Sequence, residues 1–118
     1  MTFPSRVLSS GISPLATQSI CGQATTGLTA TGSSATDALQ LGTSWSVVAT
    51  AASSTGVKLP PAENGVTNMV ANDGASTLTV YPATGSTIDG AASVTIATTK
   101  RRFFIGTSPT TWISILGA

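Results

Sequence analysis

Short runs of β-type residues recur about every 10–12 residues from Thr36 to the end of the 118-residue chain, and residues typical of turns separate them. Runs of this length at this spacing are typical of a β-sandwich or barrel. We therefore expect an all-β domain over residues 36–118, built as a small antiparallel sandwich or barrel of the jelly-roll type. The eight predicted strands cover residues 36–41, 45–51, 57–59, 66–71, 77–81, 94–97, 102–105 and 111–116.

The most specific local signal is the Asn-Asp-Gly sequence at residues 72–74. It separates the alternating runs 66–71 and 77–81, and all three residue types accept the left-handed backbone conformation that tight hairpin turns require. These two runs are therefore predicted to pair as a β-hairpin. Leu78 and Val80 would face the core, because side chains alternate along a strand.

The predicted core is small. Full burial of a large apolar side chain contributes roughly 1.5–3 kcal/mol, and each run supplies only one or two such side chains. A domain with so thin a core gains stability by burying further surface in an oligomer. The predicted inward-facing set is Leu39 or Leu41, Val47 or Val48, Leu59, Val66, Val70, Leu78, Val80, Ile88, Val94, Ile96, Phe103 or Phe104, Ile105, Ile113 and Ile115.

Residues 1–35 differ in character from the rest of the chain. Their apolar residues are sparse and irregular, with Ser, Thr and Gly between them. Such a segment cannot repay an ordering cost of roughly 1–2 kcal/mol per residue by its own burial. We predict an extended N-terminal arm that becomes ordered against a partner, with contacts through Phe3, Ile12, Leu15 and Ile20.

The residue types that carry most catalytic and metal chemistry are scarce. The chain has no histidine and a single cysteine, which excludes Ser-His-Asp and Cys-His catalytic arrangements, His-containing zinc sites and an intrachain disulfide. Asp73 and Asp89 each precede a glycine, which is typical of turn residues. The sequence therefore predicts neither an enzyme nor a bound cofactor.

The charge content limits the expected partners. Charged residues make up 8% of the chain, and five Lys and Arg against four Asp and Glu give a net charge of +1. A charge this small cannot create the field that attracts a protein to nucleic acid or to anionic lipid. No stretch has the length and apolar character of a membrane span. We therefore expect neither nucleic acid nor a membrane as a partner.

Two further features are candidate contact sites, and each has an alternative interpretation. The basic run at residues 100–102, which includes Arg101 and Arg102, either contacts an acidic protein surface or forms a solvated turn that protects a strand edge from stray pairing. Trp45 and Trp112 either pack in the core or anchor a subunit contact, where tryptophan is enriched.

A series of short motifs between residues 36 and 116 resembles a module of tailed-bacteriophage virion proteins, namely small head decoration (cement) proteins and some fibre domains. Each motif is by itself a strand or turn signal, and the resemblance does not include residues 1–35. The motifs are GVKLPPA at 56–62, VANDG at 70–74, LTVYPA at 78–83, IDG at 88–90 and TWI at 111–113.

The resemblance implies a compact β module without enzymatic activity that assembles as a homotrimer. It also implies a place on the outer surface of the phage capsid, where the trimer clamps neighbouring major capsid subunits and stabilises the head. An arm such as residues 1–35 suits this role, since an extended segment can run across several subunits. The alternative is a tail fibre or spike module that recognises host-surface glycans, although aromatic residues, which line such sites, make up only 5% of the chain.

Overall fold

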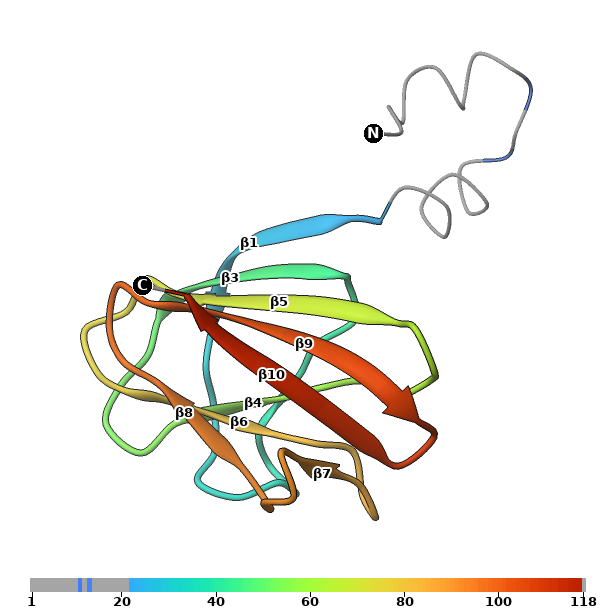
Figure 1. Cartoon of the computed structure of the whole chain (residues 1–118). Coiled ribbons are helices and arrows are strands. Elements are labelled where there is room, and N and C mark those ends of the chain that lie inside the picture. Colours follow the sequence, from blue (N-terminus) through green and yellow to red (C-terminus); the bar gives the residue numbers. More distant parts are fainter. Residues whose placement is uncertain (1–10, 12, 14–21, 118) are drawn as a thin grey trace.

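The computed structural model describes residues 11, 13 and 22–117, and every regular element in them is a β-strand (Figure 1). The strands are β1 (Ala24–Thr29), β2 (Leu39–Gln40), β3 (Trp45–Thr50), β4 (Gly56–Lys58), β5 (Thr67–Asn72), β6 (Leu78–Tyr81), β7 (Thr87–Ile88), β8 (Val94–Ile96), β9 (Arg101–Ser108) and β10 (Thr111–Gly117). They form a six-stranded sheet in the order β1-β3-β5-β9-β10-β7 and a four-stranded sheet in the order β2-β4-β6-β8. The predicted all-β fold is confirmed.

The two sheets form two layers with the hydrophobic core between them (Figure 1). Trp112 and Phe104 of the six-stranded sheet are its largest fully buried side chains, and Leu78 and Ile96 are fully buried on the four-stranded sheet. Most of the predicted inward-facing set is therefore correct. The members that the structure buries are Leu41, Val48, Leu59, Val70, Leu78, Val80, Ile88, Ile96 and Phe104.

The strand directions are mixed, whereas the sequence predicted an antiparallel domain. The pairs β5–β9, β9–β10 and β6–β8 are antiparallel, but β1–β3, β3–β5, β2–β4, β4–β6 and β7–β10 are parallel. The cause is the path of the chain: from β1 to β6, successive strands alternate between the two sheets, so neighbours within one sheet run in the same direction. The first six strands wind as a flattened coil, and β8 and β9 pair antiparallel to its last turn.

The hairpin predicted at the Asn-Asp-Gly turn is wrong, because β5 and β6 belong to different sheets. The buried Asn72 side chain fixes this crossing. Its Nδ2 donates to the carbonyl oxygens of Ser76 and Ile96, each at 2.9 Å, and its Oδ1 accepts from the Gly74 backbone nitrogen at 3.0 Å. A Cβ at Gly74 would lie 2.4 Å from the backbone nitrogen of Ala51. These contacts direct the chain from one sheet to the other instead of reversing it within one.

Among the described strands, the one hairpin of consecutive strands is β9–β10, which pairs along almost its whole length. Next to it, Gly106 of β9 passes close to the loop before β5. Its backbone nitrogen donates to the Val66 oxygen at 2.8 Å, and its oxygen accepts from the Gly65 nitrogen at 2.9 Å. A Cβ at Gly106 would lie 2.2 Å from the backbone oxygen of Glu63. Only glycine allows the two segments to approach this closely.

Part of the expected arm belongs to the β domain. β1 pairs in parallel with β3, Ala30 is buried in the core, and Thr31 forms an isolated bridge with Gly56. Among the described residues, sheet structure therefore begins at Ala24, ahead of the boundary predicted at Thr36. The arm residues predicted to contact a partner lie outside the described residues: Phe3, Ile12, Leu15 and Ile20.

Some residues predicted to face the core lie on the opposite, outer face of the six-stranded sheet, namely Ile105, Ile113 and Ile115. β10 directs Trp112 inward, so alternation directs Ile113 and Ile115 outward, where they are 46% and 61% exposed. The choice between Phe103 and Phe104 follows the same rule. Phe104 is fully buried, and Phe103 is 39% exposed on the outer face.

Candidate interaction surface

An apolar row crosses the outer face of the six-stranded sheet. Trp45 of β3 pairs with Met69 of β5. Met69 also pairs with Phe103 of β9, which pairs in turn with Ile115 of β10. Residues directly opposite on adjacent strands have Cβ atoms about 4.5–5.5 Å apart. The four side chains therefore form one continuous row across four strands, which we call the apolar row.

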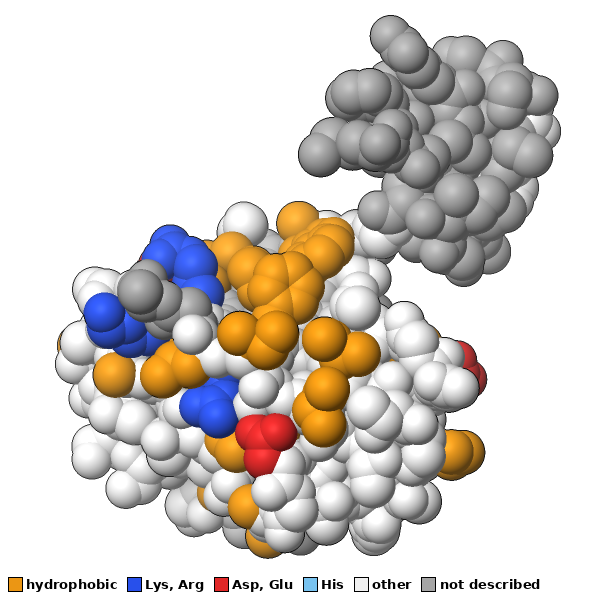
Figure 2. Space-filling model, in the orientation of Figure 1, with side chains coloured by type: hydrophobic (Ala, Val, Ile, Leu, Met, Phe, Trp, Pro, Cys, Tyr) orange, Lys and Arg blue, Asp and Glu red, His pale blue; other side chains and the backbone are white. Residues whose placement is uncertain are grey.

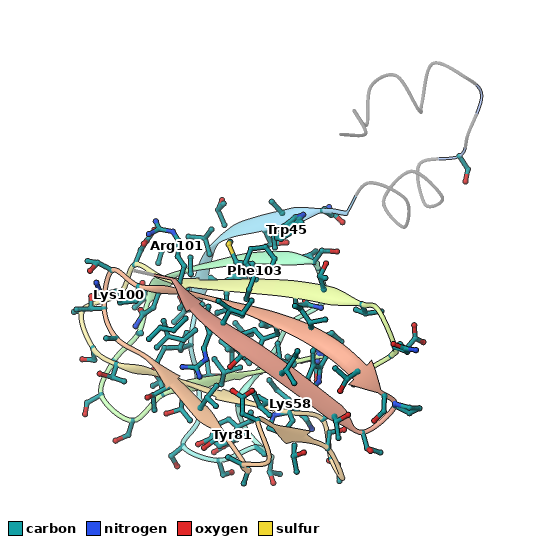
Figure 3. The ribbon with its side chains drawn as sticks, in the orientation of Figure 1. Trp45, Lys58, Tyr81, Lys100, Arg101 and Phe103 are labelled. Carbon is teal, nitrogen blue, oxygen red and sulfur yellow. The ribbon has the colours of Figure 1, made fainter. Side chains whose placement is uncertain are left out.

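The two aromatic rings of the apolar row contact each other. The ring centroids of Trp45 and Phe103 are 5.6 Å apart and the ring planes meet at 79°, an edge-to-face geometry. Because β5 lies between β3 and β9, the rings approach each other over the half-buried Met69. Figure 3 shows the two labelled rings together on the outer side of the sheet, and Figure 2 shows hydrophobic side chains gathered there. The row is a packed surface.

Further apolar residues flank the apolar row on the same face. Ile105 and Ile113 pair with each other on one side of it, and Val47 and Ala71 pair on the other side. Ala71 pairs next with Arg101, the first charged residue on this face. We call the apolar row together with these four apolar residues the outer apolar face. It is uncharged across its centre and has basic residues at one end (Figure 3).

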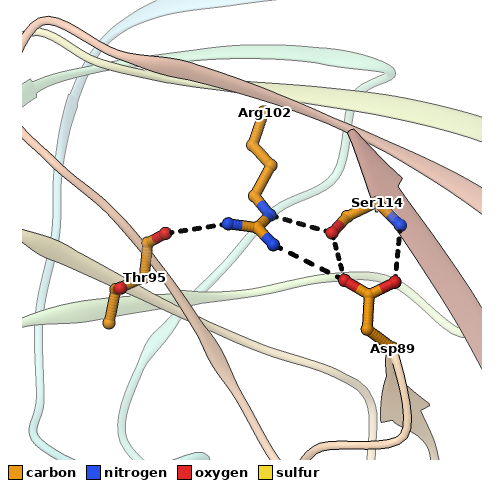
Figure 4. Close-up of polar contacts among 4 residues, drawn as sticks. All are labelled: Asp89, Thr95, Arg102 and Ser114. Atoms are coloured by element: carbon orange, nitrogen blue, oxygen red, sulfur yellow. Dashed lines mark hydrogen bonds and ion pairs between the residues drawn. The ribbon is translucent and has the colours of Figure 1, made fainter. Parts of the chain in front are cut away.

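A polar network around Arg102 joins the two sheets (Figure 4). Its Nε donates to Ser114 Oγ at 2.8 Å, and one terminal nitrogen donates to the Thr95 carbonyl of β8 at 3.3 Å. The other terminal nitrogen lies 3.5 Å from Asp89 Oδ2. Asp89 also accepts from the Ser114 backbone nitrogen at 2.9 Å and from the Ser114 hydroxyl. The Arg102 side chain is only 19% exposed, so it serves the fold and is not free for a partner.

The network makes a specific prediction for the pH dependence of stability. The hydrogen bonds from Ser114, followed by the Arg102 guanidinium, hold the pKa of Asp89 below its ordinary value of 3.8. Because folding lowers this pKa, the carboxylate stabilises the fold fully above the pKa of the unfolded chain, and the contribution disappears as the pH falls through the folded pKa. Asp89→Asn is expected to lower the free energy of unfolding by about 1 kcal/mol at pH 7, after allowance for solvent screening.

Urea denaturation of both proteins between pH 7 and pH 2 measures this difference. The two stabilities should begin to converge as the pH falls below 3.8, the ordinary pKa, and should meet once the pH has fallen through the lower pKa of the folded Asp89 carboxyl. Asp73→Asn is the matched control, since its exposed ion pair with Arg101 contributes little. A gap for Asp89→Asn that stays constant with pH would contradict a role for the charge.

The basic run does not act as one basic patch. Arg102 is engaged in the network just described, and Arg101 forms an exposed ion pair with Asp73 at 3.5 Å. Lys100 is exposed, and its side chain has no partner in the part of the chain that the structure describes. Of the two interpretations of this run, the contact with an acidic protein surface therefore loses most of its support.

The two tryptophans play different parts. Trp112 is 1% exposed and packs in the core, so a partner cannot reach it in the folded domain. Trp45 is half-buried at the edge of the outer apolar face, where a partner can reach it. Of the two interpretations of these residues, core packing therefore applies to Trp112, and a role in a subunit contact stays open for Trp45.

The residues that sequence reasoning missed as contact candidates are the central ones of this face, Met69, Phe103, Ile113 and Ile115. The sequence contains one indication of this face. In the run Trp112-Ile113-Ser114-Ile115, large apolar residues occur at positions that point to both sides of the strand. An exposed sheet face usually shows only one apolar phase. Two apolar phases indicate a strand whose second face meets another surface.

Two kinds of feature are absent from the described residues, namely a metal-binding cluster and a membrane-spanning helix. No group of three or more His, Cys, Asp or Glu side chains that could hold a metal ion occurs among the described residues. The described residues also contain no helix that is long and apolar enough to cross a membrane.

Comparisons with known proteins give no match to the chain, whether with a family model, a curated protein or a solved structure. The outer apolar face and the sequence motifs are thus the observations on which a function can be argued.

Proposed function

We propose that this chain is a structural protein of a bacteriophage particle, a capsid decoration protein without enzymatic activity. As a homotrimer on the outer surface of the head, it clamps neighbouring major capsid subunits. The observation that carries the assembled, homotrimeric part of the proposal is the outer apolar face, because a contiguous exposed apolar patch marks a site of contact with another protein chain. The resemblance of the motifs at 56–62, 70–74 and 78–83 to phage decoration modules supplies the class of assembly.

The charge distribution supports an assembled rather than a free state. Proteins that stay dispersed carry charges of both signs over much of their surface, whereas only 8% of this chain is charged. Two of its four acidic residues, Asp73 and Asp89, form ion pairs within the domain. A surface of this kind suits a protein that its neighbours cover.

In this proposal the N-terminal arm makes part of the contact with the capsid. Residues 1–21 precede the domain and contain the apolar residues predicted to contact capsid subunits, namely Phe3, Ile12, Leu15 and Ile20. Linked contacts of a tethered segment and a folded domain raise affinity without requiring either contact to be strong.

A second candidate is a tail fibre or spike module that binds host-surface glycans. The observation that favours it is the aromatic pair Trp45 and Phe103, which presents ring surface at the edge of the outer face. Aromatic side chains commonly line ligand sites. In this chain, however, the pair is continuous with aliphatic residues instead of being surrounded by polar side chains.

Immunogold labelling of intact particles of the phage that encodes the chain tests both candidates. With an antibody raised against the purified domain, we expect gold on the heads, at many positions per particle. The same antibody absorbed beforehand with purified protein is the control and should leave the heads unlabelled. Gold on the tails would support the glycan-binding alternative, and unlabelled particles would contradict both.

A further inference from the structure

We infer that the outer apolar face is the surface on which a second copy of this chain binds, with the apolar row of Trp45, Met69, Phe103 and Ile115 at its centre. This inference rests on the homotrimer part of the proposed function and assigns its interface to named residues. It concerns contact between copies, whereas the capsid contact uses other parts of the chain.

The extent of the face is the first argument. Adjacent strands are about 4.8 Å apart, so the apolar row extends about 14 Å from β3 to β10. Ile115 and Ile113 are 61% and 46% exposed on β10, where they continue the apolar surface of Phe103 and Ile105 on β9. Leaving such side chains in water forgoes the free energy that their burial would contribute.

The charges select the kind of partner. The centre of the face is uncharged, and the nearest basic residues are already balanced, since Arg101 pairs with Asp73 and Arg102 pairs with Asp89. At this end of the face an acidic protein or a nucleic acid would find only Lys100 without a side-chain partner among the described residues, because Lys58, which also has none, lies on β4 of the other sheet. A neutral apolar surface matches this face, and a second copy supplies one.

The end of the face is also self-complementary. Arg101 pairs with Ala71 at the basic end of the face, and Asp73 lies 3.5 Å from its guanidinium; both side chains are about half exposed. When two copies meet there, the arginine of one can pair with the aspartate of the other, so association loses no ion pair. In a homotrimer the outer apolar face of each copy meets its neighbours around the threefold axis, so the three faces are buried together.

The test compares two adjacent positions of β10 that point to opposite faces of the sheet. Ile115 pairs with Phe103 on the outer face, and Leu116 pairs with Arg102 on the other side. Both are exposed, at 61% and 55%, so an aspartate is tolerated equally well by the folded monomer at either position. Ile115→Asp is the test variant, and Leu116→Asp is its matched control.

Sedimentation equilibrium of the full chain at micromolar concentration is expected to give the mass of a trimer, three times the 11.7 kDa of one chain. Ile115→Asp is expected to weaken self-association at least about 100-fold, because it places like charges together in an apolar contact. Leu116→Asp should sediment as the wild type does. Circular dichroism of each variant confirms that the fold is retained.

Tryptophan fluorescence provides a second, independent measurement. Trp112 is buried in the core and gives a constant signal, whereas Trp45 lies in the apolar row. Dilution of the full chain should shift the emission to longer wavelength as Trp45 becomes exposed to water. Ile115→Asp should show the shifted emission at every concentration.

Several outcomes would overturn the inference. One is a full chain that remains monomeric at hundreds of micromolar, which would leave the face to residues 1–21 or to a different protein. Another is an equal loss of association in the Ile115→Asp and Leu116→Asp variants. Particle labelling separates this result from the proposed function: labelled heads with a monomeric chain refute the interface alone, and unlabelled particles with an oligomeric chain refute the capsid role alone.

Discussion

Replacing Trp112 with alanine is expected to lower the free energy of unfolding by about 3–5 kcal/mol. The side chain is 1% exposed and is the largest of the fully buried ones. It pairs with Gly106 of β9 on one side and Ile88 of β7 on the other, so its removal leaves a cavity that small neighbours cannot fill. A small domain has roughly 5–15 kcal/mol of total stability, and this single change removes a large part of it.

Urea denaturation followed by circular dichroism measures the effect, and Trp45→Ala is the control. Trp45 is half-buried on the outer face, so its removal from the monomer should cost about 1 kcal/mol. Trp112→Phe should also cost less than Trp112→Ala, because it keeps most of the volume and removes an indole N–H that has no hydrogen-bond partner within the described residues. Equal losses for Trp45→Ala and Trp112→Ala would contradict their placement on opposite faces.

Gly106→Ala is expected to destabilise the domain by about 3 kcal/mol, at the upper end for overpacking. The added Cβ would lie 2.2 Å from the backbone oxygen of Glu63. This contact cannot be relieved by a side-chain rotation, because both partners are backbone. Separating the strands would break the hydrogen bonds of Gly106 to Val66 and Gly65. Thermal unfolding by circular dichroism should show a markedly lower Tm.

The matched control for this variant is Gly42→Ala. A Cβ at Gly42 would have no heavy atom within 4 Å, and Gly42 has no positive φ, so alanine there should leave the Tm unchanged or raise it slightly. A normal Tm for Gly106→Ala would show that β9 and the loop before β5 are farther apart than the structure has them.

The local β pattern could be predicted from the sequence, but the connections could not. Each of the eight predicted runs contains or overlaps a strand, because alternation and turn residues act over a few neighbours. The Asn-Asp-Gly turn is an example of a connection that local sequence patterns do not determine. A tight turn reverses the chain in either case, and only the remote partners of Asn72, Ser76 and Ile96, determine that it joins two sheets.

The outer apolar face illustrates a second limit. Apolar character predicts a core position for Ile113 and Ile115, whereas in the structure Trp112 occupies an inward-facing position of β10 and alternation directs both isoleucines outward. The sequence shows that both phases are apolar, but only the strand order brings Ile115 next to Phe103 and Met69. A contact surface to which four strands each contribute single side chains cannot be recognised from the sequence of any one strand.

β1 shows a third limit. Its sequence, ATTGLT, has one large apolar residue, Leu28, and so it resembles the polar segment before it. Pairing with β3 determines its structure, since a strand at the edge of a sheet needs little apolar surface of its own. Short β7 escaped prediction for a similar reason, because it is held by its pairing with β10.

The coil of the first six strands determines how this domain must fold. Paired residues in successive turns, such as Ala24 with Trp45 and Val57 with Val80, are about 20 residues apart in sequence. Each turn of the coil must therefore overcome the entropic cost of closing a loop before its strand pairing contributes any stability. This cost slows folding relative to a chain of hairpins. Only β9–β10 can form from adjacent residues. Because β9 also pairs with β5, the six-stranded sheet is complete only once this last hairpin has joined the earlier strands.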